Sequence, residues 1–343
     1  MPERKTHLDP VAVALMVACC VLWGLNQVAA KAAMPELPAL WQAALRSLGG
    51  TLLVGLWARW RGIPIFARDG SLRAGLLAGS LFGAEFVCIF VGLQFTTASR
   101  MVVFLYTSPF VVALGMPFIA RAERLHQAQI AGLLLAFGGV LWAFAEGFAP
   151  GPHGPLHGPL NGPLNGLPHS ASNLGSRACI GDALGLAAAV FWGATTLVVR
   201  GSRLTVASAE KTLLYQLAVS SVLLVAVAVL AGPPLPAPAS VSALAWGALA
   251  FQVVVVTSIS YLVWFGLIRR YPATRLASFT LLTPVFGLVF GALLLDEAVT
   301  LRLVIALSAV AAGIVLVNRR ARRAGSPTGA DQARMRATSA VVE

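Results

Sequence analysis

Long runs of apolar residues, separated by short polar segments, follow one another along the whole chain. A bilayer core about 30 Å thick is crossed by roughly 20 apolar residues in helical form. A single segment in lipid must satisfy its own backbone hydrogen bonds, which favours helices over isolated strands. The pattern predicts ten transmembrane helices, at residues 11–30, 39–60, 72–93, 98–119, 127–145, 179–201, 208–231, 241–267, 273–295 and 301–318.

The second half of this pattern repeats the first. Residues 92–109 read GLQFTTASRMVVFLYTSP and residues 266–284 read GLIRRYPATRLASFTLLTP. The pair Trp23-Gly24 likewise returns as Trp192-Gly193. Because five helices are an odd number, the second copy enters the membrane from the opposite side. The sequence therefore predicts two inverted five-helix repeats, an arrangement in which secondary transporters bind substrate near the midplane, at the repeat interface.

Composition and charge agree with a membrane protein. Hydrophobic residues make up 58% of the 343 residues, charged residues 11%, and the mean hydropathy is +0.81, whereas soluble domains carry about a quarter charged residues. In a soluble protein a net charge of +12 would point to nucleic acid. Here most lysines and arginines fall on one side of the predicted helices, which places both termini in the cytoplasm and leaves no reason to expect a nucleic-acid partner.

The chain divides into four parts. Residues 1–145 and 179–318 are the two predicted repeats, and residues 319–343 form a basic tail predicted to be disordered. Between the repeats, residues 146–178 hold a tandem Gly-Pro-Leu-His/Asn repeat, typical of a low-complexity linker and expected on the periplasmic side. The histidines of this linker and the cysteines of the spans show no metal-ligand spacing. We therefore expect neither a metal nor another cofactor.

Two ionisable residues stand out inside the predicted spans, Arg46 and Glu85. A charge within a membrane helix is costly and usually functional. With a rise of 1.5 Å per residue, the two lie about 10 and about 12 Å below the outer ends of their helices, so they share one depth. One interpretation is a structural ion pair that joins two helices. The other is a site that binds substrate or a proton.

Other candidate site residues are polar, aromatic and proline residues within the predicted spans. Asn26 is costly in lipid, and Trp23 is either an interfacial anchor or part of a site. Tyr106, Tyr261 and Trp264 offer flat apolar walls for a substrate, although aromatic residues most often only pack. Pro109 and Pro284 lie in mid-span, where proline kinks helices and leaves a carbonyl without its usual partner. Small residues at Gly75, Gly79 and Gly83 predict close approach of another helix, and helical periodicity points Glu85 away from that ridge.

As a set, these features resemble the drug/metabolite transporter superfamily, and within it the EamA-type transporters. The resemblance rests on LWGLNQVAAK at residues 22–31, on Arg46, on the steps Ser108-Pro109 and Thr283-Pro284, and on LLLDEAVT after the ninth helix. It implies ten helices in two inverted repeats in a bacterial inner membrane. It also implies proton-driven or exchange export of small metabolites, often amino acids. The substrate does not carry over, because members of the family differ in it.

Other functions fit the sequence less well. An integral-membrane enzyme requires a cluster of His, Asp or Cys side chains at one membrane face, and the sequence supplies none. A GxxxxGK[ST] loop for nucleotides is also missing, which argues against direct coupling to ATP. A scaffold without transport leaves Arg46 and Glu85 unexplained. Within transport, an importer or facilitator of a small polar solute remains the alternative. The expected partners are a small-molecule substrate and membrane lipids, in a monomer or a homodimer.

Overall fold

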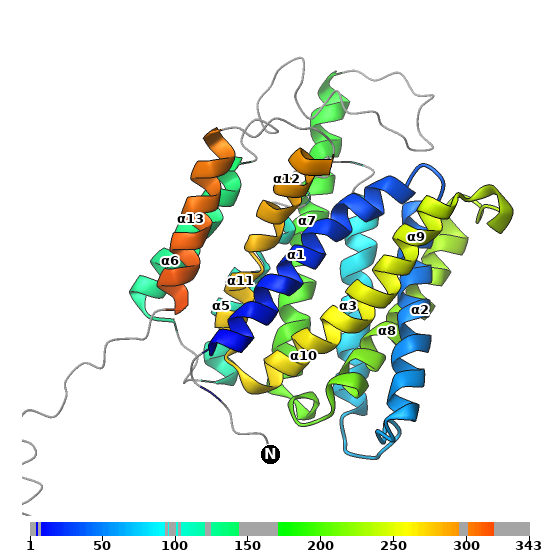
Figure 1. Ribbon diagram of the computed structural model, residues 1–343, viewed down its shortest axis with the longest axis horizontal. Helices are drawn as coiled ribbons and strands as arrows, with labels where there is room; N and C mark the ends of the chain where they lie inside the picture. Colours follow the sequence, from blue (N-terminus) through cyan, green and yellow to red (C-terminus); the bar gives the residue numbers. More distant parts are fainter. Residues whose placement is uncertain are drawn as a thin grey trace, which may run out of the picture.

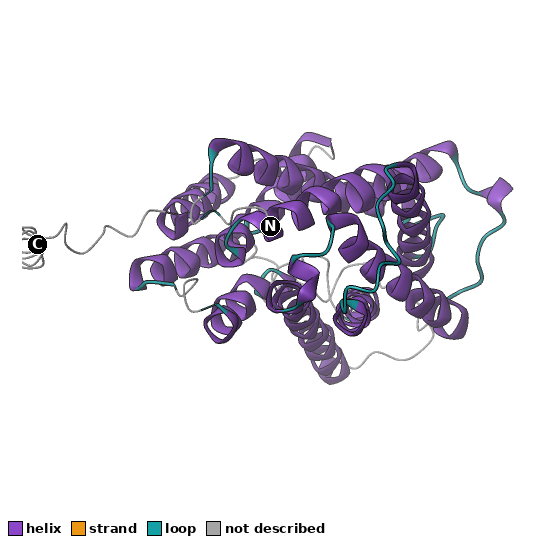
Figure 2. Ribbon diagram, turned by 90° about the horizontal axis from the view of Figure 1, so that it is seen from below, coloured by secondary structure: helices purple, strands orange, loops and turns teal. Residues whose placement is uncertain are grey.

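The computed structural model describes residues 5, 8–92, 95, 101, 104–120, 125–143, 171–294 and 301–318. All regular secondary structure in this part of the chain is helical (Figure 1; Figure 2). The first half forms α1 (Pro10–Ala33), α2 (Ala39–Trp60), α3 (Leu72–Gly92), α5 (Ser108–Ile119) and α6 (Gln127–Ala143). The second half forms α7 (Ala171–Gly201), α8 (Ala209–Ala231), α9 (Ala243–Phe251), a π-helix η5 (Gln252–Ser260), α10 (Tyr261–Arg270), α11 (Ala273–Phe279), α12 (Leu282–Leu294) and α13 (Leu301–Asn318), with short 3-10 turns η3 (Arg203–Thr205) and η4 (Pro238–Ser240).

Five of the helices that the structure describes are long and apolar enough to cross a membrane. They comprise residues Pro10–Ala30, Leu72–Gly92, Ile180–Gly201 and Ala209–Ala231, and the continuous run Ala243–Arg270. The chain is therefore an all-helical membrane protein. The first part of the predicted span 98–119, most of the predicted linker and the predicted tail lie outside the described residues.

The helices pack in pairs that match when the two halves are exchanged. The second helices of the halves, α2 and α8, pack against each other, and so do the last helices, α6 and α13 (Figure 1). The contact of α3 with α7 is matched by the contact of α10 and η5 with α1. The contact of α5 with α7 is matched by that of α12 with α1. Segments far apart in sequence thus form one bundle with paired interfaces between the halves.

The glycine ridge on α3 lets α8 approach closely, as the four-residue spacing predicts. A Cβ atom added to Gly79 would lie 2.5 Å from the carbonyl oxygen of Tyr215 and 2.7 Å from Cβ of Val219. At Gly75 an added Cβ would collide with the Tyr215 ring. Small residues are what allow helix backbones to come this close. The prediction of a close helix contact along this ridge is confirmed.

Two predicted continuous spans are interrupted in mid-bundle. A turn at Tyr106 and Thr107 precedes α5, and a turn at Thr280 and Leu281 separates α11 from α12. Pro109 and Pro284 therefore lie in the first turn of a new helix, where proline needs no hydrogen-bond partner, instead of kinking an unbroken one. Near each break a threonine hydroxyl donates to a carbonyl three residues earlier: Thr107 Oγ1 to Phe104 at 2.6 Å and Thr280 Oγ1 to Ala277 at 2.7 Å.

One boundary also differs from the sequence prediction. The linker was expected to continue to residue 178, but α7 begins at Ala171. Residues 171–178 read ASNLGSRA and lack the proline that recurs through the preceding repeat. Without proline nothing in this segment blocks the helical hydrogen bonds, so the helix extends outward from the predicted span.

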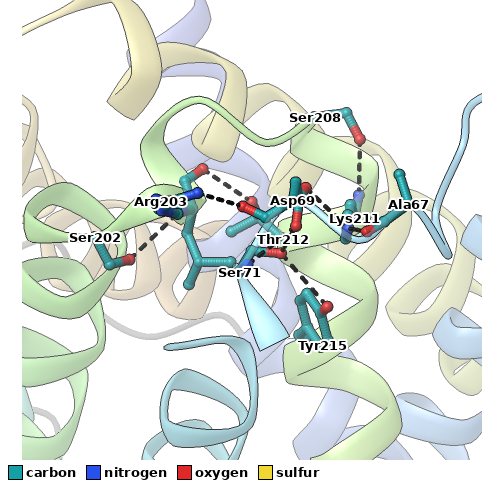
Figure 3. Close-up of polar contacts among 10 residues, drawn as sticks. Ala67, Asp69, Ser71, Ser202, Arg203, Ser208, Lys211, Thr212 and Tyr215 are labelled. Carbon is teal, nitrogen blue, oxygen red and sulfur yellow. Dashed lines mark hydrogen bonds and ion pairs between the residues drawn. The ribbon is translucent and has the colours of Figure 1, made fainter. Parts of the chain in front are cut away.

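A cluster of polar residues ties the α2–α3 loop to the second half (Figure 3). The ammonium of Lys211, on α8, donates to the Ala67 carbonyl at 2.7 Å and to Asp69 Oδ2 at 2.9 Å. Asp69 Oδ1 accepts from the Ser71 amide and hydroxyl. Arg203 Nη1 donates to the Asp69 carbonyl at 3.1 Å. Lys211 is only 4% exposed, so its charge depends on these oxygens.

We expect Asp69→Asn to lower the free energy of unfolding by about 1 kcal/mol, a figure reduced for solvent screening at the half-exposed carboxylate. Hydrogen bonds from Ser71 and then the ammonium of Lys211 hold the pKa of Asp69 well below its ordinary value. The folded pKa lies below the unfolded value of about 4, so this stabilisation is fully present above that pH and declines as the pH falls further.

Thermal unfolding of the two proteins in detergent at pH 7 and at acidic pH measures this contribution. The double variant Asp69→Asn/Lys211→Met is the control, because it removes both charges together. The double variant should lose less unfolding free energy than the sum of the losses in the single variants Asp69→Asn and Lys211→Met. Strictly additive losses would contradict direct coupling between the two side chains.

Candidate functional site

A cavity of about 160 Å³ lies inside the bundle, lined by both halves. The first half contributes side chains from α1, α2, α3 and the residues just before α5, and the second half contributes side chains from α7, α8, η5 and α10. Every predicted substrate- or proton-binding residue lines this one cavity: Trp23, Asn26, Arg46, Glu85, Tyr106, Tyr261 and Trp264. The structure therefore brings the candidates together, while their roles stay predictions. Pro109 and Pro284 do not line it.

Arg46 reaches the cavity from α2. Its side chain is 5% exposed, and its guanidinium carbon lies 4.2 Å from the centre of the Phe86 ring. A cation over an aromatic face is attracted to the ring. Its Nε and Nη2 atoms have no hydrogen-bond partner among the described residues. The contact with Phe86 thus holds the guanidinium while leaving two of its donor atoms unused.

Glu85 enters from α3, on the face away from the glycine ridge. It is 6% exposed, and its Oε2 atom has no hydrogen-bond partner in the described part of the chain. Across the same residues no ion pair joins Glu85 to Arg46. A buried charge without a partner costs several kcal/mol. Because no direct ion pair joins them, Arg46 and Glu85 do not act as a structural ion pair in this structure. Both groups have hydrogen-bonding atoms left for another species.

Aromatic side chains form one wall of the cavity. The Trp23 ring meets those of Tyr261 and Trp264 edge to face, with centroids 6.3 and 5.8 Å apart. The Trp23 indole Nε1 donates to Ser260 Oγ at 2.8 Å. Tyr106 packs in the same way against Trp192 at 5.5 Å. Trp23 is buried and satisfied by protein, so it is not an anchor at the membrane surface.

Polar side chains that sequence reasoning left out also line the cavity. Gln216, on α8, is fully buried, and its Oε1 atom has no hydrogen-bond partner within the described residues. Gln252 donates through Nε2 to Gln42 Oε1 at 3.2 Å. Both lie within apolar runs, a signal that singles out polar residues as candidates. Phe82 and Phe86 carried no comparable signal, because aromatic residues are frequent throughout such helices. Trp192 was marked in the sequence only as the repeat counterpart of Trp23.

A π-helix places part of the second half in the cavity. The sequence predicts one regular helix over residues 241–267, but residues Gln252–Ser260 form η5 between α9 and α10. π-turns inside α-helices are rare and frequently occur at functional sites. Four side chains reach the cavity from this segment and from α10, which follows it: Gln252, Val256, Tyr261 and Trp264. Its counterpart α3, which carries Glu85, is a regular α-helix.

The cavity reaches toward one end of the bundle. Its lining includes Ala30 and Met34 at the end of α1, and Ile89 and Phe90 at the end of α3. Toward the beginning of α1, tightly packed side chains replace it. Residues with 0% exposure there include Met16, Cys20, Ile268, Leu276 and Leu281. No group of three or more His, Cys, Asp or Glu side chains placed to hold a metal ion occurs in the described ranges.

The apolar helical bundle and its cavity with two buried charged residues are those of a multi-pass membrane protein with an internal polar site. Within that class, the chain belongs to the EamA-like transporter family, whose model matches residues 10–145 and 179–319. The family resemblance seen in the sequence is thereby confirmed. The protein is a transporter and not an enzyme.

Individual relatives agree over nearly the whole chain. An uncharacterized transporter of Bacillus subtilis, YvbV, is 26% identical over 94% of both chains. A protein of Escherichia coli named "Probable amino-acid metabolite efflux pump" is 26% identical over 84% of this chain and 87% of its own. A solved crystal structure matches with a TM-score of 0.71 and 19% identity, over 93% of this chain and 100% of that one. The last likeness supports the fold alone.

Proposed function

We propose that this protein is a secondary transporter that exports small polar metabolites, amino acids among them, across a bacterial inner membrane by alternating access. The observation that carries the proposal is the cavity between the two halves, in which Arg46 and Glu85 are buried with unused hydrogen-bonding atoms. The name of the Escherichia coli relative supports export and the amino-acid class. An importer or facilitator of a small polar solute is the alternative.

The proposed topology has ten transmembrane helices in two inverted five-helix repeats, with both termini in the cytoplasm. The matched helix contacts between the halves support the repeat. The end of the bundle that carries the start of α1 and the α2–α3 loop (Figure 1) is rich in arginine, in Arg59, Arg61, Arg68 and Arg73. By the positive-inside rule this is the cytoplasmic end.

In this topology the cavity extends toward the periplasm, since its lining includes the last turns of α1 and α3. The packed side chains around Met16 and Cys20 then close the cytoplasmic side. We interpret the structure as outward-facing. Export requires a second state, in which the same site opens to the cytoplasm through this packed layer.

Arg46 is proposed to bind a substrate carboxylate. The Nε and Nη2 atoms that lack partners form one edge of the planar guanidinium, which matches the two oxygens of a carboxylate. Glu85 is proposed to carry the coupled proton or to bind a substrate amine. Asn26 and Gln216 add two acceptor oxygens without partners among the described residues. One chain supplies all these groups, so the transporting unit is proposed to be the monomer, alone or within a homodimer.

The test is an untargeted comparison of small molecules in the medium of cells that express the intact protein, an Arg46→Gln variant or neither. We expect a few amino acids or related metabolites to accumulate outside only with the intact protein, because the variant lacks the charged edge that binds carboxylate. Equal expression of both proteins in the membrane is the control. Equal media combined with different uptake of a solute would replace export by import, and no difference in either direction would contradict transport through this cavity.

A further inference from the structure

The cytoplasmic end of α2 and the loop after it expose large aromatic rings. Trp60 is 75% exposed and Phe66, in the loop, is 92% exposed. Trp57, 42% exposed, packs against Trp60 with ring centroids 5.2 Å apart. Aromatic side chains so exposed are unfavourable in water but are preferred at the membrane interface. This loop therefore lies at the level of lipid headgroups in the proposed topology, on which the inference rests.

Four arginines lie close to these rings in the sequence. Arg59, Arg61, Arg68 and Arg73 are exposed, and within the described residues none of them has an ion-pair partner. Arg61 lies over the Trp57 ring at 5.4 Å. Asp69 is the one acidic residue between Trp57 and Arg73 in the sequence, and its carboxylate is already bonded to Ser71 and Lys211. The surface is thus positive, and these guanidinium groups have no ion-pair partner in the part of the chain that the structure describes.

The loop is held in one shape from within the protein. Gly62 and Gly70 take positive φ angles of 64° and 74°, which suit glycine. The Ile63 amide donates to the Ala58 carbonyl at 2.9 Å, and the second half fixes the other end of the loop through Lys211 and Arg203 (Figure 3). A surface ordered in advance binds a ligand without first paying for its own ordering.

We propose that this surface binds the headgroup of an anionic phospholipid in the cytoplasmic leaflet. It consists of Trp57, Arg59, Trp60, Arg61, Phe66 and Arg68. Guanidinium groups bind phosphate oxygens through paired hydrogen bonds, and basic residues next to the membrane are drawn to anionic lipids. The aromatic rings insert beside the acyl chains. Because Lys211 and Arg203 hold the loop, a bound lipid also stabilises the contact between the two halves.

The test measures lipid binding to the full-length protein in detergent by native mass spectrometry and thermal unfolding. Phosphatidylglycerol is compared with phosphatidylcholine. We expect several-fold more phosphatidylglycerol to be retained, together with a higher unfolding temperature. The variant R59Q/R61Q/R68Q should retain both lipids equally and show no rise. The variant R319Q/R320Q/R322Q removes the same charge from the tail and should keep the preference.

Three outcomes overturn the proposal. The loop variant keeps the preference for phosphatidylglycerol, the tail variant loses it, or soluble glycerol phosphate displaces the lipid, which would indicate a site for free anions. A Phe66→Ser variant, which keeps every arginine, should bind more weakly and guards against misfolding of the triple variant. No step of the assay requires transport, so its failure is distinguishable from failure of the proposed export.

Discussion

Replacing Glu85 by glutamine is expected to abolish the pH dependence of transport. Glu85 is the only carboxylate among the described residues that line the cavity, and glutamine keeps its size but carries no titratable proton. If one proton is exchanged per substrate, the accumulation ratio changes about tenfold per unit of pH gradient, since tenfold corresponds to about 1.4 kcal/mol. The variant should show a ratio that does not respond to the gradient, measured with labelled substrate in proteoliposomes.

A matched control removes a carboxylate outside the cavity. Glu36 accepts hydrogen bonds from Ser242 between the end of α1 and the start of α9, and these bonds lower its pKa. Glu36→Gln should leave the pH response intact. If Glu85→Gln transports with an unchanged pH profile, Glu85 does not carry the coupled proton, and its proposed role reduces to binding a substrate amine.

Replacing Gly79 by leucine is expected to prevent the protein from folding into a stable bundle. The new Cβ would lie 2.5 Å from a backbone oxygen of α8, and a backbone atom cannot move aside as a flexible side chain can. Overpacking of a core usually costs about 1 to 3 kcal/mol and occasionally more. Here two long helices must separate, so we expect a loss of about 3 kcal/mol or more, and little monodisperse protein by size-exclusion chromatography.

Gly247 on α9 supplies the control for this substitution. An added Cβ at Gly247 meets nothing within 4 Å. Gly247→Leu should therefore yield protein with an unfolding temperature close to that of the unaltered chain. Equal yield and equal unfolding temperatures for the two variants would show that contact along the α3 ridge does not limit stability.

Much of the fold and of the cavity followed from the sequence. Apolar runs of membrane length predicted most helices within a few residues, because lipid forces each segment to satisfy its own backbone hydrogen bonds. The spacing of Gly75, Gly79 and Gly83 predicted the close contact of α3 with another helix, which is α8. The same periodicity predicted that Glu85 points away from this contact, and Glu85 lines the cavity. Charged or polar residues inside spans pointed to Asn26, Arg46 and Glu85, because such residues are costly in lipid.

What only the tertiary structure decided depends on distances between helices that are remote in sequence. At several places backbone hydrogen-bond patterns of similar energy compete, and packing settles which one forms. These places are the breaks before Pro109 and Pro284, the π-helix η5 and the early start of α7. The inclusion of Phe82 and Phe86 in the site depends on which helices are neighbours. The missing direct bond between Arg46 and Glu85 depends on the same arrangement, because equal depth along two helices does not fix how far apart their side chains end.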